Sequence, residues 1–296
     1  MDRFTELQIF AAVVENEGFS AGARKLGISS PVVTRAIADL EARLGIKLLT
    51  RTTRYVRVTD AGKRYFEDAK RLLSDLADAD EAAAGINGEP SGQLAITAPV
   101  LFGKMFVLPG VVDYLNRYPK MDVHALFLDR VVNLLEEGLD VGIRIGELAD
   151  SSMNALRVGT VRRVVCASPD YIARHGAPQN PNDLHHHTII TANGLNASHE
   201  WKFSEDVSIR VQPRLRFSTN DAALEAALLG FGITRLLSYQ TAPYIASGRL
   251  QPLLENASRR ELPIHIIHRE GRYASAKIRN FVDLMVERLR KDPALH

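Results

Sequence analysis

The chain has 296 residues, of which 46% are hydrophobic and 24% charged, and its formal net charge at pH 7 is +2. This length accommodates two or three domains, and the apolar fraction is too high for a wholly disordered chain. The single cysteine excludes an internal disulfide framework and a zinc site built from several cysteines. The N-terminus is charged where a signal peptide is apolar, and no stretch reaches the length of a membrane span. We therefore expect a cytoplasmic protein without a membrane partner.

Charge is distributed unevenly over the first ninety residues. Residues 18–64 hold ten Lys or Arg and three Asp or Glu, whereas residues 65–88 hold two basic and six acidic residues. A basic segment beside an acidic one creates a local field that selects partners. A solvated surface explains most charge clusters. Here the basic segment coincides with a break between two helical patterns, which favours an anionic partner.

The first helical pattern covers residues 3–17, where apolar residues recur at the spacing of one buried stripe. We expect Gly18 to end this helix. A short second helix follows, with Ser20 as its N-cap and Gly27 directly after its last residue.

A third helix is expected from Ser30 to about Leu44, with Gly45 after it. Pro31 has no N–H group, so it disrupts a helix interior but suits the first helical position. The Ser30 hydroxyl can cap this helix. Its apolar face is spaced by four, three and four residues and comprises Val33, Ile37, Leu40 and Leu44.

A helix, a short helix, a turn and a third helix with a polar, basic outward face fit the helix-turn-helix pattern. A helix fits the major groove of DNA, where its N-terminal residues reach the base edges and its free N–H groups favour phosphate. Hydroxyl groups can donate to phosphates or bases, a valine can contact a thymine methyl group, and an arginine can pair with guanine or phosphate. The residues that we expect to face DNA are Ser20, Ser29, Ser30, Pro31, Val32, Thr34 and Arg35.

Residues 45–62 contain β-branched residues in partial alternation around a centre rich in Thr and Arg. We interpret them as two short strands around a turn at residues 51–54, which makes a wing. Arg51, Thr53 and Arg54 could then enter the minor groove or contact the DNA backbone. A solvated hairpin is the alternative.

The stretch "FSAGARKLGISSPVVTRAIADLEARLGIKLLTRTTRYVRVTDAG" resembles the winged helix-turn-helix of the LysR-type transcriptional regulators. Thr34 stands where the family usually has Ser, which keeps the hydroxyl, and Leu49 stands where Phe is common, which keeps an apolar residue. The residues that match the family pattern are Ser20, Ala23, Leu26, Ser29, Pro31, Thr34, Ile37, Leu40, Glu41, Gly45, Leu48, Arg51, Thr59 and Gly62.

A long helix is expected from about residue 61 to residue 84, capped by Thr59 or Asp60. Its apolar residues continue in steps of three and four for about three heptads, as in a two-stranded coiled coil. Similar helices in the resembled family pair two chains, so we expect a homodimer, although a helix buried within one subunit is the alternative. The apolar positions are Tyr65, Phe66, Ala69, Leu72, Leu73, Leu76, Ala79 and Ala83.

From residue 93 onward, strand patterns alternate with helix patterns, which favours parallel α/β sheets. Expected strands include "QLAITA", "MDVHALFL", "LDVGIRIG" and the single strand "SIRVQPRLRF". Expected helices include "KMFVLPGVVDYLNRYP", "RVVNLLEEG" and a final helix over residues 274–291.

The resemblance implies the order of the domains. It predicts a winged helix-turn-helix over 1–60, which is an all-α-type module, then a linker helix and hinge over 61–91. An α/β effector-binding domain over 92–296 is expected to have two lobes and to resemble periplasmic binding proteins. Lobe one is expected to contain 92–161 and 267–296, and lobe two 162–266. The implied partners are double-stranded DNA, an unknown small-molecule effector and further copies of the chain as a dimer or tetramer, with RNA polymerase as another candidate.

Ligands of open α/β sheets bind beyond the C-terminal ends of the strands, which in two lobes becomes the cleft between them. Helix N-termini near Phe102 and Asp221 could offer N–H groups to a small anion. Arg144 has two candidate partners, an effector or a carboxylate of the protein. For each residue alone, packing at a strand end is the alternative. The candidates for effector binding are Thr97, Ala98, Pro99, Val100, Phe102, Arg144, Gly146, Asn193, Thr219 and Thr234, with Asp129, Arg130, Ile145, Thr191, Asn220 and Ile233 at further strand ends.

Motifs of catalysis and cofactor binding are missing from the sequence. It has no G-x-G-x-x-G, no P-loop and no G-x-S-x-G, so we expect no cofactor and no catalytic residues. The run His185–His187 lacks the spacing of a metal site, and Cys166 lies in an apolar strand pattern typical of a buried thiol. We therefore expect a ligand-responsive DNA-binding regulator. The alternatives are an α/β enzyme with an appended DNA-binding module and a DNA-binding architectural protein that senses no ligand.

Overall fold

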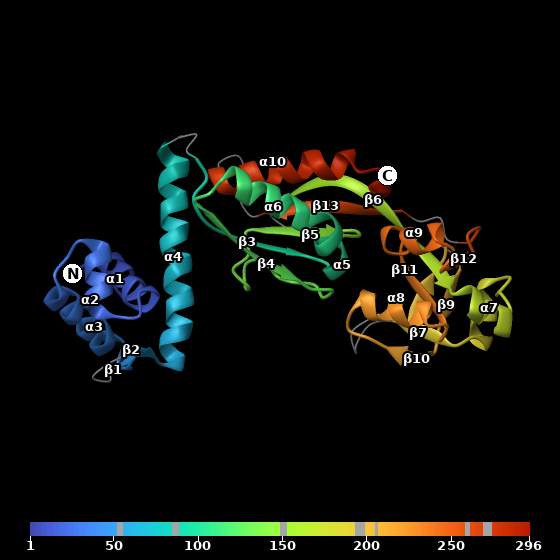
Figure 1. Ribbon diagram of the computed structural model, residues 1–296, viewed down its shortest axis with the longest axis horizontal. Helices are drawn as coiled ribbons and strands as arrows, with labels where there is room; N and C mark the ends of the chain where they lie inside the picture. The colour runs from blue at the N-terminus through green and yellow to red at the C-terminus, as the bar shows by residue number, and fades with distance from the viewer. Residues whose placement is uncertain are drawn as a thin grey trace. The chain divides into compact units, whose positions relative to one another are not determined.

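The computed structural model describes residues 1–51, 56–84, 89–148, 153–192, 199–204, 207–257, 261–268 and 274–296. The chain forms two compact units, residues 1–88 and 89–296 (Figure 1). None of the helices described has both the length and the apolar character needed to cross a membrane.

The N-terminal unit consists of helices and one small β-hairpin, as expected for a winged helix-turn-helix. The strands of the hairpin pair antiparallel, with Leu49 opposite Val58 and Thr50 opposite Arg57. The elements are α1 (Arg3–Glu15), α2 (Phe19–Leu26), α3 (Ser30–Leu44), β1 (Leu49–Arg51), β2 (Val56–Val58) and α4 (Asp60–Ala84).

Two predicted N-caps are wrong, by two residues for α2 and by one for α3, whereas the predicted start of α3 at Ser30 is confirmed. The N-cap of α2 is Gly18, so Ser20 is already helical, and the N-cap of α3 is Ser29, so Ser30 is the first helical residue. The backbone of Ser29 is extended, as an N-cap requires, and Pro31 follows within the first turn. Neither cap makes a side-chain hydrogen bond, so here the backbone break and not a hydroxyl sets the helix start.

Other predicted helix limits are confirmed. Gly27 and Gly45 follow α2 and α3 in the left-handed conformation, with φ of 66° and 69°. The Thr59 hydroxyl accepts a hydrogen bond from the N–H of Gly62 at 2.9 Å, as the predicted cap of α4 does. Gly62 also lets α4 approach the hairpin, since a Cβ there would lie 2.1 Å from the carbonyl oxygen of Leu48.

The core of the N-terminal unit lies between α1, α3 and α4. Phe10 packs edge-to-face on Tyr65 and Phe66, with ring centroids 5.5 and 6.5 Å apart. Three of the four predicted apolar positions of α3 are buried, but Leu44 is exposed because it lies in the last turn of the helix. The buried cluster comprises Leu7, Ile9, Phe10, Val13, Ala23, Val33, Ala36, Ile37, Leu40, Leu48, Leu49 and Ala69.

The C-terminal unit is built on two sheet halves that share the long strand β6 (Asn154–Ala167). Residues 154–162 of β6 pair with β13, whereas residues 163–167 pair with β11 and β12. The strand order is β10-β7-β11-β6-β13-β5-β3-β4. This confirms the predicted two-lobed α/β domain. The lobe limits remain predictions, although β13 begins at Glu261 and pairs in the first sheet, five residues before the expected limit at 266.

The elements of the first half follow the expected alternation of strands and helices only in part. They are β3 (Gly92–Ala98), α5 (Val100–Phe102), η1 (Gly103–Val107), α6 (Leu108–Arg117), β4 (Met121–Phe127), β5 (Val141–Ile145), β13 (Glu261–His268), α10 (Ala276–Lys291) and η3 (Pro293–Leu295).

The second half contains shorter elements. They are α7 (Pro169–His175), η2 (Pro181–His186), β7 (Ile189–Thr191), β8 (Glu200–Lys202), β9 (Ser208–Arg210), β10 (Pro213–Arg216), α8 (Asn220–Leu228), β11 (Ile233–Leu237), α9 (Ser238–Ala246) and β12 (Gln251–Leu253).

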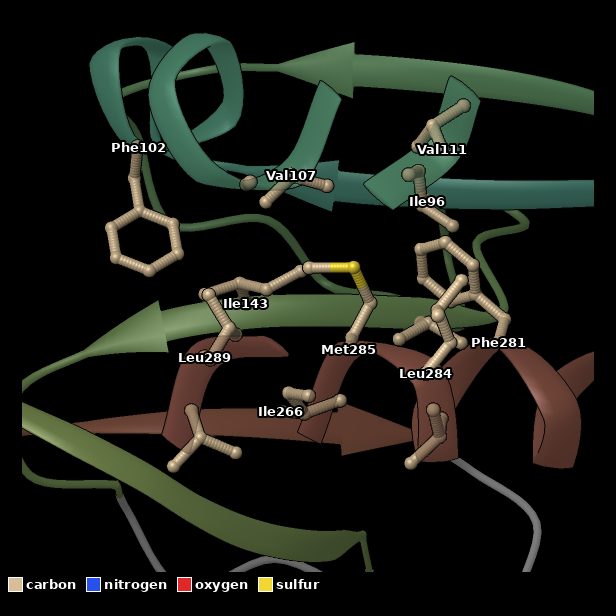
Figure 2. Packing of buried hydrophobic residues seen from close by; sticks show 14 of the residues in the cluster. Ile96, Phe102, Val107, Val111, Ile143, Ile266, Phe281, Leu284, Met285 and Leu289 are labelled. Carbon is tan, nitrogen blue, oxygen red and sulfur yellow. The ribbon is translucent and has the colours of Figure 1, made fainter. Parts of the chain in front are cut away.

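Helices α6 and α10 cover one face of the first sheet (Figure 1). Phe281, Met285 and Leu289 of α10 point into the same buried cluster as Ile96, Ile143 and Ile266 of the strands (Figure 2). The Tyr114 hydroxyl of α6 donates to the carbonyl oxygen of Lys277 at 2.9 Å, which ties the two helices together. The strand ends that carry the candidate ligand site are therefore attached to a rigid, fully packed layer.

Two predicted elements differ in the structure. The segment expected as a helix over 130–138 forms turns, and the Asn133 side chain accepts from the N–H of Leu135 at 3.0 Å. Asn competes in this way with helical hydrogen bonds, and two valines precede it. The expected strand over 208–217 is divided into β9 and β10, which pair with different partners.

The first helix after β3 contains a π-helical turn over Gly103–Val107, directly before Pro109. Pro109 lacks the N–H that would bond to the carbonyl four residues earlier, and its ring displaces that carbonyl. A π-turn absorbs such a displacement without ending the helix.

Candidate DNA-binding surface and ligand pocket

The start of α3 presents a polar and basic face outward. The Arg35 side chain is 86% exposed, and its only ion pair among the described residues is a long contact of 4.0 Å with Asp39. Val32 is 39% exposed. Of the other residues expected to face DNA, Ser20, Ser29 and Pro31 are exposed, and Ser30 and Thr34 are half-buried.

The opposite face of α3 is buried. Val33, Ile37 and Leu40 are almost completely inaccessible to solvent and pack against the core of the unit. One face of α3 is therefore buried in the core, while the opposite face of its first two turns remains accessible to a groove of DNA.

Glu41, near the end of α3, anchors the first strand of the hairpin. One of its carboxylate oxygens accepts from the N–H groups of Leu48 and Leu49 at 2.9 and 3.0 Å, and the other pairs with the Lys47 ammonium at 2.6 Å. Burial raises the pKa of Glu41, but the hydrogen bonds from Lys47, Leu49 and Leu48 outweigh this, so its pKa lies below the usual range. This buried carboxylate fixes the position of the hairpin relative to α3.

The two predicted strands are confirmed, whereas residues 52–55, which include most of the predicted turn at 51–54, lie outside the described residues. Arg51 ends β1, and its backbone pairs with Val56. Thr53 and Arg54 lie outside the described residues, as does the side chain of Arg51.

A pocket of about 290 Å³ lies in the C-terminal unit where the two sheet halves meet. Pro99 and Arg144, both expected at the ligand site, line it, as do four of the further strand-end residues: Asp129, Arg130, Ile145 and Asn220. The complete lining is Pro99, Leu128, Asp129, Arg130, Val131, Arg144, Ile145, Arg163, Ala192, Asn220, Arg235, Leu236, Leu237, Tyr239, Gln240 and Leu262.

The carboxylate of Asp129 connects the two halves across this pocket. One oxygen accepts from the N–H of Val100 at 2.9 Å, at the start of the helix after β3. The other accepts from the N–H and the side-chain amide of Asn220, at 2.9 and 3.1 Å, at the start of α8. The two helix N-termini expected to favour a small anion thus both bind a carboxylate of the protein itself.

Four arginines and one aspartate supply the charge of the pocket. Arg130 forms a bidentate pair with Glu137, at 2.7 and 3.0 Å. Arg144 instead donates to two backbone carbonyl oxygens, of Ile143 at 3.1 Å and Val132 at 3.0 Å. Burial lowers the pKa of Arg144, and the nearby charge of Glu137 partly offsets this effect.

Arg235, on β11, is held by aromatic rings and a carbonyl. Its guanidinium lies 4.9 Å from the ring centroid of Trp201 and 5.8 Å from that of Phe203, and it donates to the carbonyl oxygen of Lys202 at 3.0 Å. Burial and the neighbouring charge of Arg163 lower the pKa of Arg235 to about 9.

Several other expected ligand residues do not line the pocket. Ala98 and Phe102 belong to the packed core, and the buried Thr97 side chain faces the neighbourhood of Gly142. Thr234, the second residue of β11, is buried. Both faces of β3 are covered near its end, so Thr97 and Ala98 are buried although they point to opposite faces.

The remaining expected positions are at the rim or beyond it. Val100 contributes its N–H to Asp129, and Thr219 is the N-cap of α8 beside Asn220. Gly146 follows β5 with φ of 114° and donates its N–H to the carbonyl oxygen of Pro263. Asn193 lies outside the described residues.

Sequence reasoning missed Arg163, Arg235, Tyr239 and Gln240. The two arginines could have been recognised, because a charged residue inside an apolar strand pattern needs a polar or charged partner, and Arg144 was selected partly in that way. No sequence pattern marks Tyr239 and Gln240, since only the tertiary fold brings the start of α9 to the pocket. Among the described residues, no group of three or more His, Cys, Asp or Glu could hold a metal ion.

Together, the amphipathic helix-turn-helix unit and the two-lobed domain with a central pocket define a class: DNA-binding proteins that respond to a ligand. Two family models match the chain. The model for the bacterial regulatory helix-turn-helix protein, lysR family, matches residues 4–63, and the model for the LysR substrate binding domain matches residues 87–290.

Known proteins are similar over almost the whole length. An HTH-type transcriptional regulator of Xanthomonas campestris pv. campestris is 32% identical over 96% of this chain and 85% of its own. The regulator CrgA of Neisseria meningitidis is 30% identical over 96% of both chains, and the CrgA structure has a TM-score of 0.63 over 96% of this chain and 98% of its own. The structure of AphB, a virulence activator of Vibrio cholerae, has a TM-score of 0.60 at 26% identity over 97% of this chain and 99% of its own.

The chain therefore belongs to the LysR family of transcriptional regulators, with an N-terminal helix-turn-helix for DNA and a C-terminal effector-binding domain.

Proposed function

We propose that this LysR-type regulator reads its DNA sites with the first two turns of α3 and responds to a small molecule in the pocket lined by Asp129, Arg144 and Arg235. The observation that carries the proposal is the pocket itself, because both halves of the effector-binding domain contribute to its lining. A ligand there contacts both lobes at once, so its affinity depends on how the lobes are arranged. Such differential affinity is what lets a ligand shift a conformational equilibrium.

For the DNA side, Arg35 is the residue proposed to recognise a base, since it is exposed at the start of α3 and has only one weak ion pair among the described residues. The wing residues Arg51, Thr53 and Arg54 are proposed to contact the DNA backbone or the minor groove. The site of action is then the bacterial cytoplasm, where the chromosome lies.

A homodimer through α4 is proposed from the burial pattern of that helix. Tyr65, Phe66 and Ala69 pack on the helix's own unit, but Leu72 and Leu76, further along, are 48% and 38% exposed. Leucines at this spacing suit a second copy of the helix. Two copies would present two recognition helices to two half-sites. Pairing of dimers into tetramers and contact with RNA polymerase are extensions of the same proposal.

The enzyme alternative has less support. The relatives are regulators, and the charged groups of the pocket serve binding in the proposal, with no step of bond making or breaking. An enzyme would consume a pocket ligand, whereas a regulator would leave it unchanged.

The test is footprinting of genomic fragments with the purified full-length chain. Protection of a few short sites over competing DNA is expected, and the genes beside those sites suggest effectors to add. An effector should change the affinity or the length of the footprint and be recovered intact. Uniform binding to all fragments would contradict the regulator, and turnover of an added compound would favour the enzyme.

A further inference from the structure

The pocket holds more positive charge than the protein itself pairs with carboxylates. Of its four arginines, Arg130 is matched by Glu137. Among the residues described in this unit, no carboxylate forms a salt bridge with Arg144 or Arg235, whose guanidinium groups bind only neutral carbonyls and aromatic rings. Half-buried guanidinium groups of this kind are costly unless an anion compensates them.

The one carboxylate of the lining does not supply that compensation. Both oxygens of Asp129 already accept hydrogen bonds from N–H groups of Val100 and Asn220, and its single negative charge stands against four arginines in the lining. The arginines therefore dominate the field inside the pocket. A volume of about 290 Å³ is at the lower end for ligand sites and suits a compact molecule.

We infer that the pocket binds a small organic anion, a carboxylate or phosphate ester, which Arg144 of lobe one and Arg235 of lobe two hold between them. This inference rests on the proposed function, in that the same pocket is the effector site. Guanidinium groups suit this role because their N–H donors match carboxylate and phosphate oxygens. An anion held from both sides also strengthens the contact between the lobes, which a neutral molecule of the same shape does not.

The chain provides its own reporter of binding. Trp201 is the only tryptophan of the sequence, and the Arg235 guanidinium lies 4.9 Å from its ring centroid. An anion that pairs with Arg235 changes the electrostatic environment of the ring, so Trp201 fluorescence responds to occupancy.

The experiment is a fluorescence titration of the full-length protein at constant ionic strength. The probes are inorganic phosphate, succinate and benzoate, with succinamide and benzamide as neutral counterparts. A saturable response to at least one anion and none to the amides is expected. Arg144→Gln, which does not contact Trp201, should raise the Kd by at least about tenfold, because one charged contact is lost. Arg235→Lys keeps the charge but loses the planar geometry and should weaken binding as well.

The matched control is Arg210→Gln, an exposed arginine on β9 outside the pocket, which should bind as the wild type does. Three results would overturn the inference: no saturable response to any of the three anions, equal responses to acids and amides, or unchanged affinity in both pocket variants. DNA binding of the same preparation is measured in parallel. Anion binding that leaves DNA affinity unchanged supports the ligand class and counts against the proposed function alone.

Discussion

Asp129 provides the sharpest test of how the two lobes are connected. Its two oxygens accept three hydrogen bonds, one from Val100 in the first lobe and two from Asn220 in the second. Asp129→Asn leaves the size unchanged but replaces one oxygen by an NH₂ group, which donates. The amide can accept from Val100 or from the N–H of Asn220, but not from both.

The loss can be estimated from these contacts. Hydrogen bonds to a charged acceptor contribute about 1.5–3 kcal/mol each, and the remaining bond becomes a neutral one of about 1 kcal/mol. Because the site is only half-buried, we expect the lobe connection to lose about 2–3 kcal/mol in all. This corresponds to roughly 30- to 150-fold faster amide exchange wherever local opening limits exchange.

Hydrogen exchange of the full-length protein measures this directly. Faster exchange is expected in the segments that begin at Val100 and Asn220, while the helix-turn-helix unit stays unchanged. Asp122→Asn, an exposed carboxylate on β4 in the same lobe, is the control and should leave both segments as in the wild type. Unchanged exchange at both segments in Asp129→Asn would refute the proposed bridge, and so would an equal increase over the whole chain.

Three further predictions concern the N-terminal unit. Arg54→Ala should weaken binding to all DNA sequences alike and lower the slope of log affinity against log salt by about one, measured by titration at several salt concentrations; a selective loss at some sequences would contradict a backbone contact. Glu41→Gln should destabilise the unit by about 1–3 kcal/mol in denaturant unfolding. The pKa of Glu41 is lowered in the folded state, so its contribution to the free energy of unfolding is present above the unfolded pKa of about 4.5 and is lost as the pH falls through the folded pKa. The difference in unfolding free energy between wild type and variant should therefore shrink below pH 4.5. A difference that stays constant with pH would contradict the proposed role of the ionised carboxylate. Replacing Leu72 and Leu76 together by Asp should convert dimers to monomers in sedimentation, and an unchanged dimer would exclude α4 as the interface.

Much of the N-terminal unit could be predicted because its signals are local. Gly27 and Gly45 end helices through their own backbone conformations, and Thr59 caps α4 with its own hydroxyl. The N-caps of α2 and α3 were misplaced because Gly18 and Ser29 serve as caps without any side-chain hydrogen bond, so a serine hydroxyl did not mark either cap.

The pocket was harder to predict, since its residues meet only in the folded domain. Strand ends were expected to carry it, and Pro99, Arg144 and Asp129 do line it. Thr97 and Ala98 were expected there too, but both faces of β3 are covered at its end, so both side chains are buried. Arg235 belongs to the site because β11 pairs with the second part of β6, and no local sequence pattern predicts this pairing.

The most direct measurement for the whole account is selection of DNA sites from a random-sequence pool by the full-length chain, by Arg35→Ala and by Arg3→Ala. Arg3 is exposed at the start of α1 and is not part of α3, so it serves as the matched control. The wild type and Arg3→Ala should select the same site, while Arg35→Ala should lose discrimination at one base pair per half-site, worth about 1–3 kcal/mol. Selection of an identical site by all three proteins, with identical preference at every position, would contradict the assignment of α3 as the helix that reads DNA.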